Sequence, residues 1–102
     1  DAQKYYENVI GISVSGKKPV EIQIAFSELQ TQYIESQPLH KSQEFVKKLG
    51  NRFVYKFYLV PNYEFYALIF GLGTEAVIIS PQIEKKKIFN MLEQINKLYK
   101  YY

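Results

Sequence analysis

The sequence contains no cysteine, no tryptophan and a single histidine, His40. The absence of cysteine excludes disulfide frameworks, thiolate metal sites and cysteine nucleophiles. One histidine also excludes a histidine-rich metal site and argues against a catalytic dyad that depends on imidazole. There is no signal-peptide pattern, and no apolar run approaches the ~18 residues of a membrane span. These absences predict a cytoplasmic protein with no metal site, no cofactor and no membrane contact.

Charge of either sign is also modest. The chain of 102 residues carries 13 Lys and Arg against 10 Asp and Glu, a net charge of +3. A protein that binds nucleic acid through phosphates alone usually has a denser basic patch. By contrast, 47% of the residues are hydrophobic and 17% are aromatic, which predicts one folded domain. The 10 tyrosines suit half-buried positions and contact surfaces, because the ring is apolar and the hydroxyl is polar.

The first half of the chain predicts a strand, a helix and a hairpin. Residues 20–26 alternate between apolar and polar, which is typical of a half-buried strand. Ser27 and Gln30 form a capping-box pattern that predicts a helix over 28–36, with Leu29 and Tyr33 on its inner side. Two further strands are expected on either side of the turn at Gly50 and Asn51.

The second strand of this hairpin has two candidate inner faces. Burying Lys56 would be costly, so the alternate set points to the core: Phe53, Tyr55, Phe57 and Leu59. The set expected on the outer face of the sheet is Val54, Lys56, Tyr58 and Val60.

The second half predicts a helix, a strand and a last helix. Asn62 begins a helix with an inner stripe, and a short apolar strand follows over 75–80. Ser80 is expected to cap the last helix, with Pro81 at its first position. The inner stripe of the earlier helix is Phe65, Leu68, Ile69 and Leu72, and the apolar stripe of the last helix is Ile88, Met91, Leu92, Ile95 and Tyr99.

The predicted order of elements corresponds to an α+β, ferredoxin-like βαββαβ fold with an additional C-terminal helix. The sheet is expected to have four strands and to be mostly antiparallel. Residues 1–18 are interpreted as a lead-in segment, and residues 19–102 as the domain.

Several segments together resemble a known family, the C-terminal extension (WCX) of bacterial WYL-domain transcriptional regulators. They are "PVEIQIAFS", "QPLHKSQE", "GTEAVIISPQIEKK" and the lead-in "YYENVIGISV". Within the second segment, the residues that match the family's loop motif are Pro38, His40, Ser42 and Gln43. Gly73 and Pro81 match the glycine and the proline on either side of the last strand.

The resemblance implies a non-catalytic module for dimerisation or signal relay. Proteins of that family bind DNA through an N-terminal winged helix-turn-helix, and a WYL domain between the two ends is thought to sense a ligand. Neither domain is contained in this sequence, so both are expected as partners upstream in the same protein. A homodimer is expected, with DNA bound only through the N-terminal domain.

Two interpretations of the loop around His40 remain open. The loop is either a structural element, in which Pro38, the imidazole, Ser42 and Gln43 satisfy turn groups, or a ligand contact. The expected outer face of the sheet is likewise either a solvated or helix-covered surface, or an interface with another subunit or with the WYL domain.

Alternative functions are kept beside the regulatory one. The first is a small-molecule or nucleotide sensor of ACT-like type, and the second is an autonomous nucleic-acid-binding domain. Lys85, Lys86 and Lys87 form a basic run that is either a solvated helix face or a phosphate contact. The stretch "NRFVYKFY" is similar to the aromatic strand of an RNA-recognition motif but lacks its glycine, and no motif places a catalytic carboxylate, so no enzyme is predicted.

Overall fold

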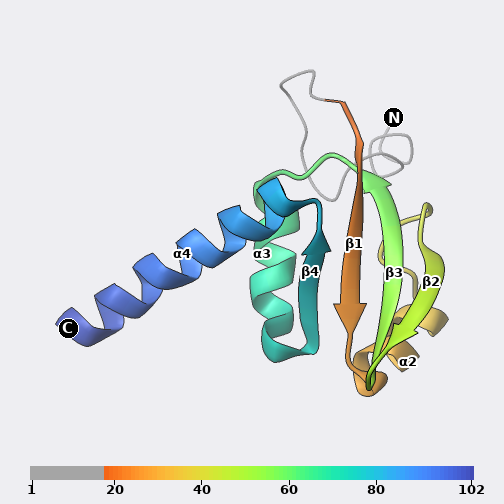
Figure 1. Cartoon of the computed structure of the whole chain (residues 1–102), viewed down its shortest axis with the longest axis horizontal. Helices are drawn as coiled ribbons and strands as arrows, with labels where there is room; N and C mark the ends of the chain where they lie inside the picture. Colours follow the sequence, from red (N-terminus) through yellow and green to blue (C-terminus); the bar gives the residue numbers. More distant parts are fainter. Residues whose placement is uncertain (1–17) are drawn as a thin grey trace.

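The computed structural model describes residues 18–102, and the predicted lead-in segment lies outside them except for Lys18. The described chain forms an α+β fold with a four-stranded antiparallel sheet in the order β2-β3-β1-β4 (Figure 1). Its elements are β1 (Val20–Phe26), α2 (Glu28–Ser36), β2 (Glu44–Leu49), β3 (Arg52–Leu59), α3 (Tyr63–Leu72), the 3-10 turn η1 (Gly73–Glu75), β4 (Ala76–Ser80) and α4 (Gln82–Tyr101). The predicted ferredoxin-like plan with an added C-terminal helix is confirmed.

The core lies between one face of this sheet and the helices α2 and α3. Alternation in β1 and β3 directs one apolar set to that face, as predicted, although Phe53 is only half-buried. The helices contribute Ile34, Phe65 and Ile69, each at most 4% exposed. Phe26 is in edge-to-face contact with both Tyr55 and Phe57. Burial of these side chains supplies most of the driving force for folding.

The inner side of α2 differs from the prediction. Leu29 and Tyr33 are exposed, and Ile34 is the buried residue of this helix. Ser27 does cap the helix, since its hydroxyl accepts a hydrogen bond from the backbone N–H of Gln30 at 3.1 Å. The prediction that Leu29 and Tyr33 lie on the inner side is therefore wrong. Ile34 is surrounded by polar residues in the sequence, so packing against the sheet, and not a helical pattern, determines which side of α2 is buried.

The hairpin between β2 and β3 turns at Gly50, whose φ of +63° is a conformation that favours glycine. The pairing of β2 with β3 shifts register between Phe45 and Lys47, so Val46 forms an irregularity in this edge strand. Phe45 therefore lies beside Tyr55 in an edge-to-face contact, while the residues of β2 remain exposed.

The start of α4 also differs from the prediction. Ser80 is the last residue of β4, and Pro81 takes the cap position without a side-chain hydrogen bond. From there α4 leaves the body of the molecule and projects outward, so its C-terminal half lies beside none of the labelled strands (Figure 1). The final helix therefore does not cover the outer face of the sheet. Over residues 18–102, no helix is long and apolar enough to cross a membrane.

Candidate functional site

The most distinctive surface of the described chain is the apolar side of α4. Ile88, Met91, Ile95, Leu98 and Tyr102 follow one another at alternating steps of three and four residues. This spacing places them in one line along the helix, which we call the seam, as at the a and d positions of a coiled coil. Apolar residues at both a and d are typical of helices that pair with another helix.

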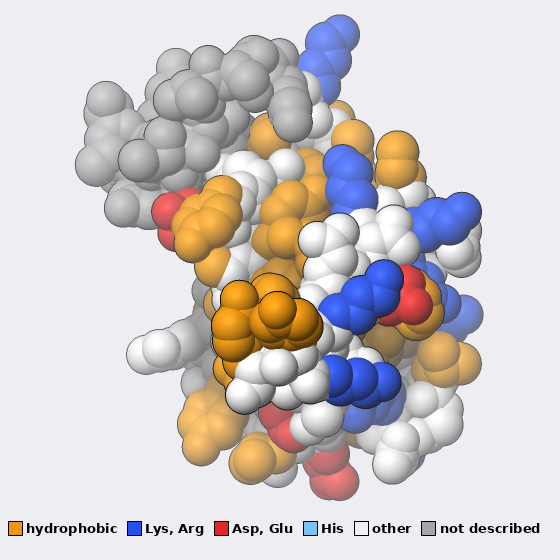
Figure 2. Space-filling model, turned by 90° about the vertical axis from the view of Figure 1, so that its left-hand side faces the viewer, with side chains coloured by type: hydrophobic (Ala, Val, Ile, Leu, Met, Phe, Trp, Pro, Cys, Tyr) orange, Lys and Arg blue, Asp and Glu red, His pale blue; other side chains and the backbone are white. Residues whose placement is uncertain are grey.

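Most of the seam has no cover within the described chain. Ile88 packs against the core cluster, but Met91 is 39% exposed, Ile95 40% and Leu98 57%. Leu92 and Tyr99 flank the seam and are exposed as well. Seen from the side to which α4 projects, hydrophobic side chains gather at the centre of the molecule with lysines beside them (Figure 2). An apolar surface of this kind marks an interaction site more often than a solvated face.

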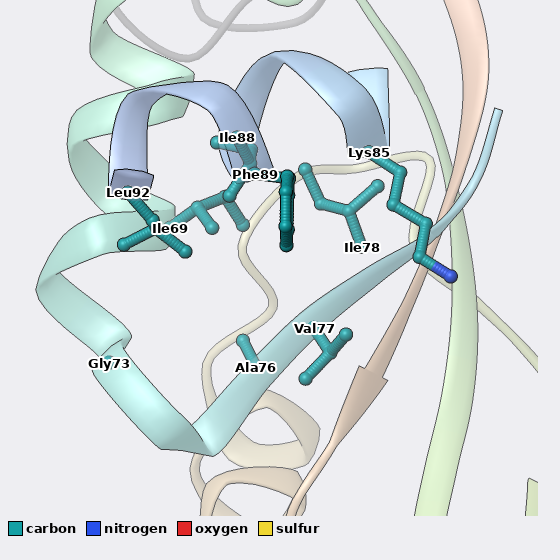
Figure 3. Close-up of a pocket in the computed structure, with 9 residues that line it drawn as sticks. All are labelled: Ile69, Gly73, Ala76, Val77, Ile78, Lys85, Ile88, Phe89 and Leu92. Carbon is teal, nitrogen blue, oxygen red and sulfur yellow. The ribbon is translucent and has the colours of Figure 1, made fainter. Parts of the chain in front are cut away.

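A shallow apolar groove lies at the base of α4, and we call it the groove. Its volume is about 240 Å³. Figure 3 shows that side chains from the first turns of α4, from α3 and from β4 surround it, and that the Lys85 amine points away from the apolar cluster. The residues that line it are Ile69, Gly73, Ala76, Val77, Ile78, Lys85, Ile88, Phe89 and Leu92.

A buried carboxylate anchors α4 beside this groove. Glu84 is 5% exposed, accepts a hydrogen bond from the Tyr66 hydroxyl of α3, and lies 3.6 Å from the Lys87 ammonium. Burial, and then the contact with Glu84, raises the pKa of Tyr66 well above its ordinary value, so this phenol stays protonated and can donate. The contact fixes the first turn of α4 to α3 and thereby sets the direction in which the helix projects.

The loop that contains His40 is held by several hydrogen bonds. The Ser42 backbone N–H donates to His40 Nδ1 at 3.1 Å, and the Ser42 hydroxyl accepts from the backbone N–H of Tyr58 at 2.8 Å. The Gln43 amide donates to the Ile34 carbonyl at 2.9 Å and accepts from the Leu39 N–H at 3.0 Å. Three of the four motif residues, His40, Ser42 and Gln43, thus form hydrogen bonds with backbone groups of this same chain.

Pro38, the fourth residue of the motif, is exposed, whereas His40 is only 5% exposed. The geometry therefore assembles His40, Ser42 and Gln43 between the end of α2 and the end of β3. This location is separate from α4 and from its groove.

The structure divides the four residues expected on the outer face of the sheet. Val54 and Val60 are buried, with 0% and 3% exposure, so they offer no surface to a partner. Lys56 is half-exposed and pairs with Glu44 at 3.5 Å, and Tyr58 is 57% exposed. An interface on this face would therefore rest on Lys56 and Tyr58. The facing residues of β1 are Glu21 and Gln23, which leaves Tyr58 without an aromatic neighbour across that strand pair.

The basic run of α4 is separated from Arg52, a cation that could otherwise share a phosphate with it. Lys85, Lys86 and Lys87 are exposed in the first turns of α4, and Lys87 pairs with Glu84. Arg52 donates to the carbonyl of Thr74 at 2.7 Å, which places it near the start of β4. β4 runs its full length between that position and the base of α4 (Figure 1). Arg52 therefore lies too far from Lys85, Lys86 and Lys87 to share a phosphate with them.

The sequence interpretation identified the apolar stripe of α4 but missed that most of it is uncovered. The available signal was the spacing, because Leu98 and Tyr102 extend the line of Ile88, Met91 and Ile95 as a 3.5-residue repeat.

Among residues 18–102, no group of three or more His, Asp or Glu is placed to hold a metal ion. The chain matches no known family model. No curated protein matches it either.

Proposed function

We propose that this chain is a non-catalytic association module, and that it serves dimerisation and signal relay in a WYL-type DNA-binding regulator. The observation that supports the proposal is the exposed seam of α4, which is amphipathic and projects from a well-packed body. The four-stranded ferredoxin-like body also contains three of the four segments on which the resemblance to the WCX extension rests.

The driving force for association is the removal of the apolar surface of α4 from water. Burial of apolar area contributes roughly 25 cal/mol per Å², so exposed Met, Ile, Leu and Tyr side chains gain free energy when a partner covers them. Tyr99, Tyr101 and Tyr102 at the end of α4 are more than four-fifths exposed, and tyrosine is enriched in protein interfaces. In the whole regulator, the partner is a second copy of the protein. DNA is contacted only by the upstream domain, and the setting is the cytoplasm.

The test is the molar mass of the 102-residue chain, measured by light scattering over a concentration series. The expected result is a dimer whose fraction rises with concentration. Ile95→Lys should yield a monomer, whereas Asn96→Lys, which adds the same charge on the adjacent and more polar side, should leave the dimer. A monomer at every concentration, or a dimer that tolerates Ile95→Lys, would contradict the proposal.

A further variant distinguishes an interface on the outer face of the sheet from an interface on α4. Tyr58→Asp places a carboxylate on the exposed aromatic residue of that face. Because α4 does not cover this face, we expect Tyr58→Asp to leave the molar mass unchanged. Loss of the dimer in Tyr58→Asp alone would transfer the interface from α4 to the sheet.

A second candidate function is effector sensing, and the groove is the observation that favours it. Its lining is apolar, and Lys85, whose amine points away from the apolar cluster, has a long side chain that can turn toward a small aliphatic acid at the rim. Its volume lies below the ~300–1,000 Å³ of typical ligand pockets, which favours association as the principal function. A thermal shift with small aliphatic carboxylates that disappears in Lys85→Met would support the sensor; no shift in the unaltered chain would exclude it for these ligands.

A further inference from the structure

We propose that α4 pairs in antiparallel orientation with α4 of a second copy, so that Met91 faces the partner's Tyr102 and Ile95 faces the partner's Leu98. This inference rests on the proposed association function and specifies its geometry. The resulting dimer has two-fold symmetry, because each contact occurs twice with the roles exchanged.

The overlap follows from which part of the seam is uncovered. Glu84 and Ile88 face the body of their own chain, so a partner helix cannot reach them without displacing α3 or β4. From Met91 onward every residue of the helix is exposed. The segment from Met91 to Tyr102 spans about 18 Å at the α-helical rise, which sets the length over which two copies overlap.

The register follows from the order of the seam residues. In an antiparallel pair, an a position of one helix packs against a d position of the other. Ile95 and Tyr102 occupy a positions, and Met91 and Leu98 occupy d positions. Matching Ile95 with the partner's Leu98 also matches Tyr102 with the partner's Met91. No seam residue in the overlap is then left without a partner.

The antiparallel direction of the two helices follows from their charges and from where the sheet-and-helix bodies would lie. A parallel pair would bring Lys85, Lys86 and Lys87 of both copies to the same end, where like charges repel. It would also place both bodies at that end, on helices whose axes lie only about 8–10 Å apart. The antiparallel pair separates the lysine clusters and puts the bodies at opposite ends.

The groove gains an occupant in this arrangement. Ile88, three residues before Met91 on the same side of the helix, lines the groove, as does Leu92 beside it. The partner's Tyr101 and Tyr102 therefore reach the mouth of the groove, where Val77 is 43% exposed. Each copy contributes an aromatic helix end and receives one, so the contact is self-complementary.

The size of this interface is typical of a weak, reversible association. The overlap and the tyrosines at the groove bury on the order of 1,000 Å² in total, at the low end of specific protein interfaces. A dimer of this size is expected to be weak and to dissociate on dilution. In the whole regulator, upstream domains would add to it by raising the effective concentration.

The absence of cysteine permits a direct test of direction and register. Met91→Cys and Tyr102→Cys are prepared separately and oxidised alone and as an equimolar mixture. In the antiparallel dimer only the mixture should form a covalent dimer, because position 91 faces the partner's position 102 and not its own equivalent. Asn96→Cys mixed with Tyr102→Cys is the control and should remain uncrosslinked.

The other outcomes separate this inference from the function on which it rests. Covalent dimers in each single variant alone would indicate parallel helices and overturn the antiparallel arrangement, while dimerisation through α4 would stand. A dimer by light scattering in which neither single variants nor mixture crosslink would place the interface away from the seam. A chain that is monomeric by light scattering would overturn both.

Discussion

At the scale of single residues, Gln43 has a larger structural role than its half-buried position indicates. Its amide bridges the Ile34 carbonyl near the end of α2 and the Leu39 N–H in the following loop. Both of these groups lie where neither helix nor sheet would supply a partner. The contacts of Gln43 and Ser42 favour the structural interpretation of the loop over a ligand contact.

Gln43→Glu tests this interpretation with almost no change in shape. The carboxylate can still accept from Leu39, but it places an acceptor against the Ile34 carbonyl and leaves that group without its donor. We expect the free energy of unfolding to fall by about 1–3 kcal/mol. Chemical denaturation at neutral pH measures the change.

The matched control for this variant is Gln37→Glu, which makes the same substitution at an exposed neighbouring position. It should change stability by less than ~0.5 kcal/mol. If both variants unfold at the same denaturant concentration as the unaltered chain, the loop is not held by Gln43.

Tyr55 links stability to alkaline pH. Burial, and then its hydrogen bond to Glu35, raises the pKa of the Tyr55 phenol from 10.0 to about 12. Between these two values the unfolded chain loses the proton and the folded chain retains it, so the free energy of unfolding falls as pH rises through this interval. Below pH 10 the Tyr55 phenol is protonated in both the folded and the unfolded chain, so its full contribution to the free energy of unfolding is present.

The measurement is denaturant unfolding of the unaltered chain and of Tyr55→Phe at a series of pH values from about 9 to about 12, which spans the ordinary and the raised pKa of the phenol. Other tyrosines titrate in both proteins, so the informative quantity is the difference between them. The decline should be smaller in Tyr55→Phe, because that position no longer ionises. Identical declines would show that Tyr55 is not protected in the folded state.

At the scale of elements, the alternation of apolar residues was sufficient to predict β1 and β3, but not to orient every helix. β1 and β3 each have a complete period-two pattern, and the cost of burying Lys56 chooses the inner face. α2 instead has polar residues around Ile34, so its buried side is set by tertiary packing and not by its own pattern. The burial of Val54 and Val60 on the other side of the sheet likewise depends on neighbours that a strand pattern does not reveal.

Elements also meet at places that local sequence cannot show. The Ser27 hydroxyl, expected only to cap α2, also donates to the Glu75 carboxylate at 2.5 Å, and its backbone N–H donates to the Glu75 carbonyl at 3.0 Å. The start of α2 is therefore joined to the turn that precedes β4, which is 48 residues away in the sequence. The predicted Ser27 and Gln30 pattern identified the cap but not this second partner.

Ser27→Ala removes the cap and the contact with Glu75 together. We expect a loss of about 1–2 kcal/mol in the free energy of unfolding, at the upper end of values for a helix cap alone. Ser36→Ala is the comparison, because its hydroxyl makes one exposed bond to the Tyr33 carbonyl at the other end of the helix. Equal stability of the two variants in thermal or chemical unfolding would show that the link to Glu75 contributes nothing.

At the scale of the whole molecule, the chain combines a compact sheet-and-helix body with a helix that extends beyond it (Figure 1). The body has its own core and its own hydrogen-bonded loop. The projecting part of α4 has neither, since every residue from Met91 to Tyr102 is exposed. An isolated helix shorter than ~12–15 residues is marginally stable in water, so the end of α4 depends on a partner for its stability.

This dependence predicts that the hydrogen exchange of α4 changes with protein concentration. In dilute solution, amides from residue 93 to 101 should exchange rapidly, while those of β1 and β3 remain protected. At concentrations where the dimer forms, pairing should slow exchange in α4 and leave the strands as they were. Hydrogen exchange followed by mass spectrometry of C-terminal peptides, at concentrations on both sides of the dimer transition, gives the comparison.

Two variants at neighbouring positions make this measurement decisive. Leu98→Lys places a charge within the seam and should keep α4 in rapid exchange at every concentration. Lys97→Gln changes a residue outside the seam on the same turn and should retain the concentration dependence. Slow exchange of α4 in a dilute solution of the Leu98→Lys variant would mean that the projecting helix is stable alone. The prediction that a partner stabilises it would then be wrong.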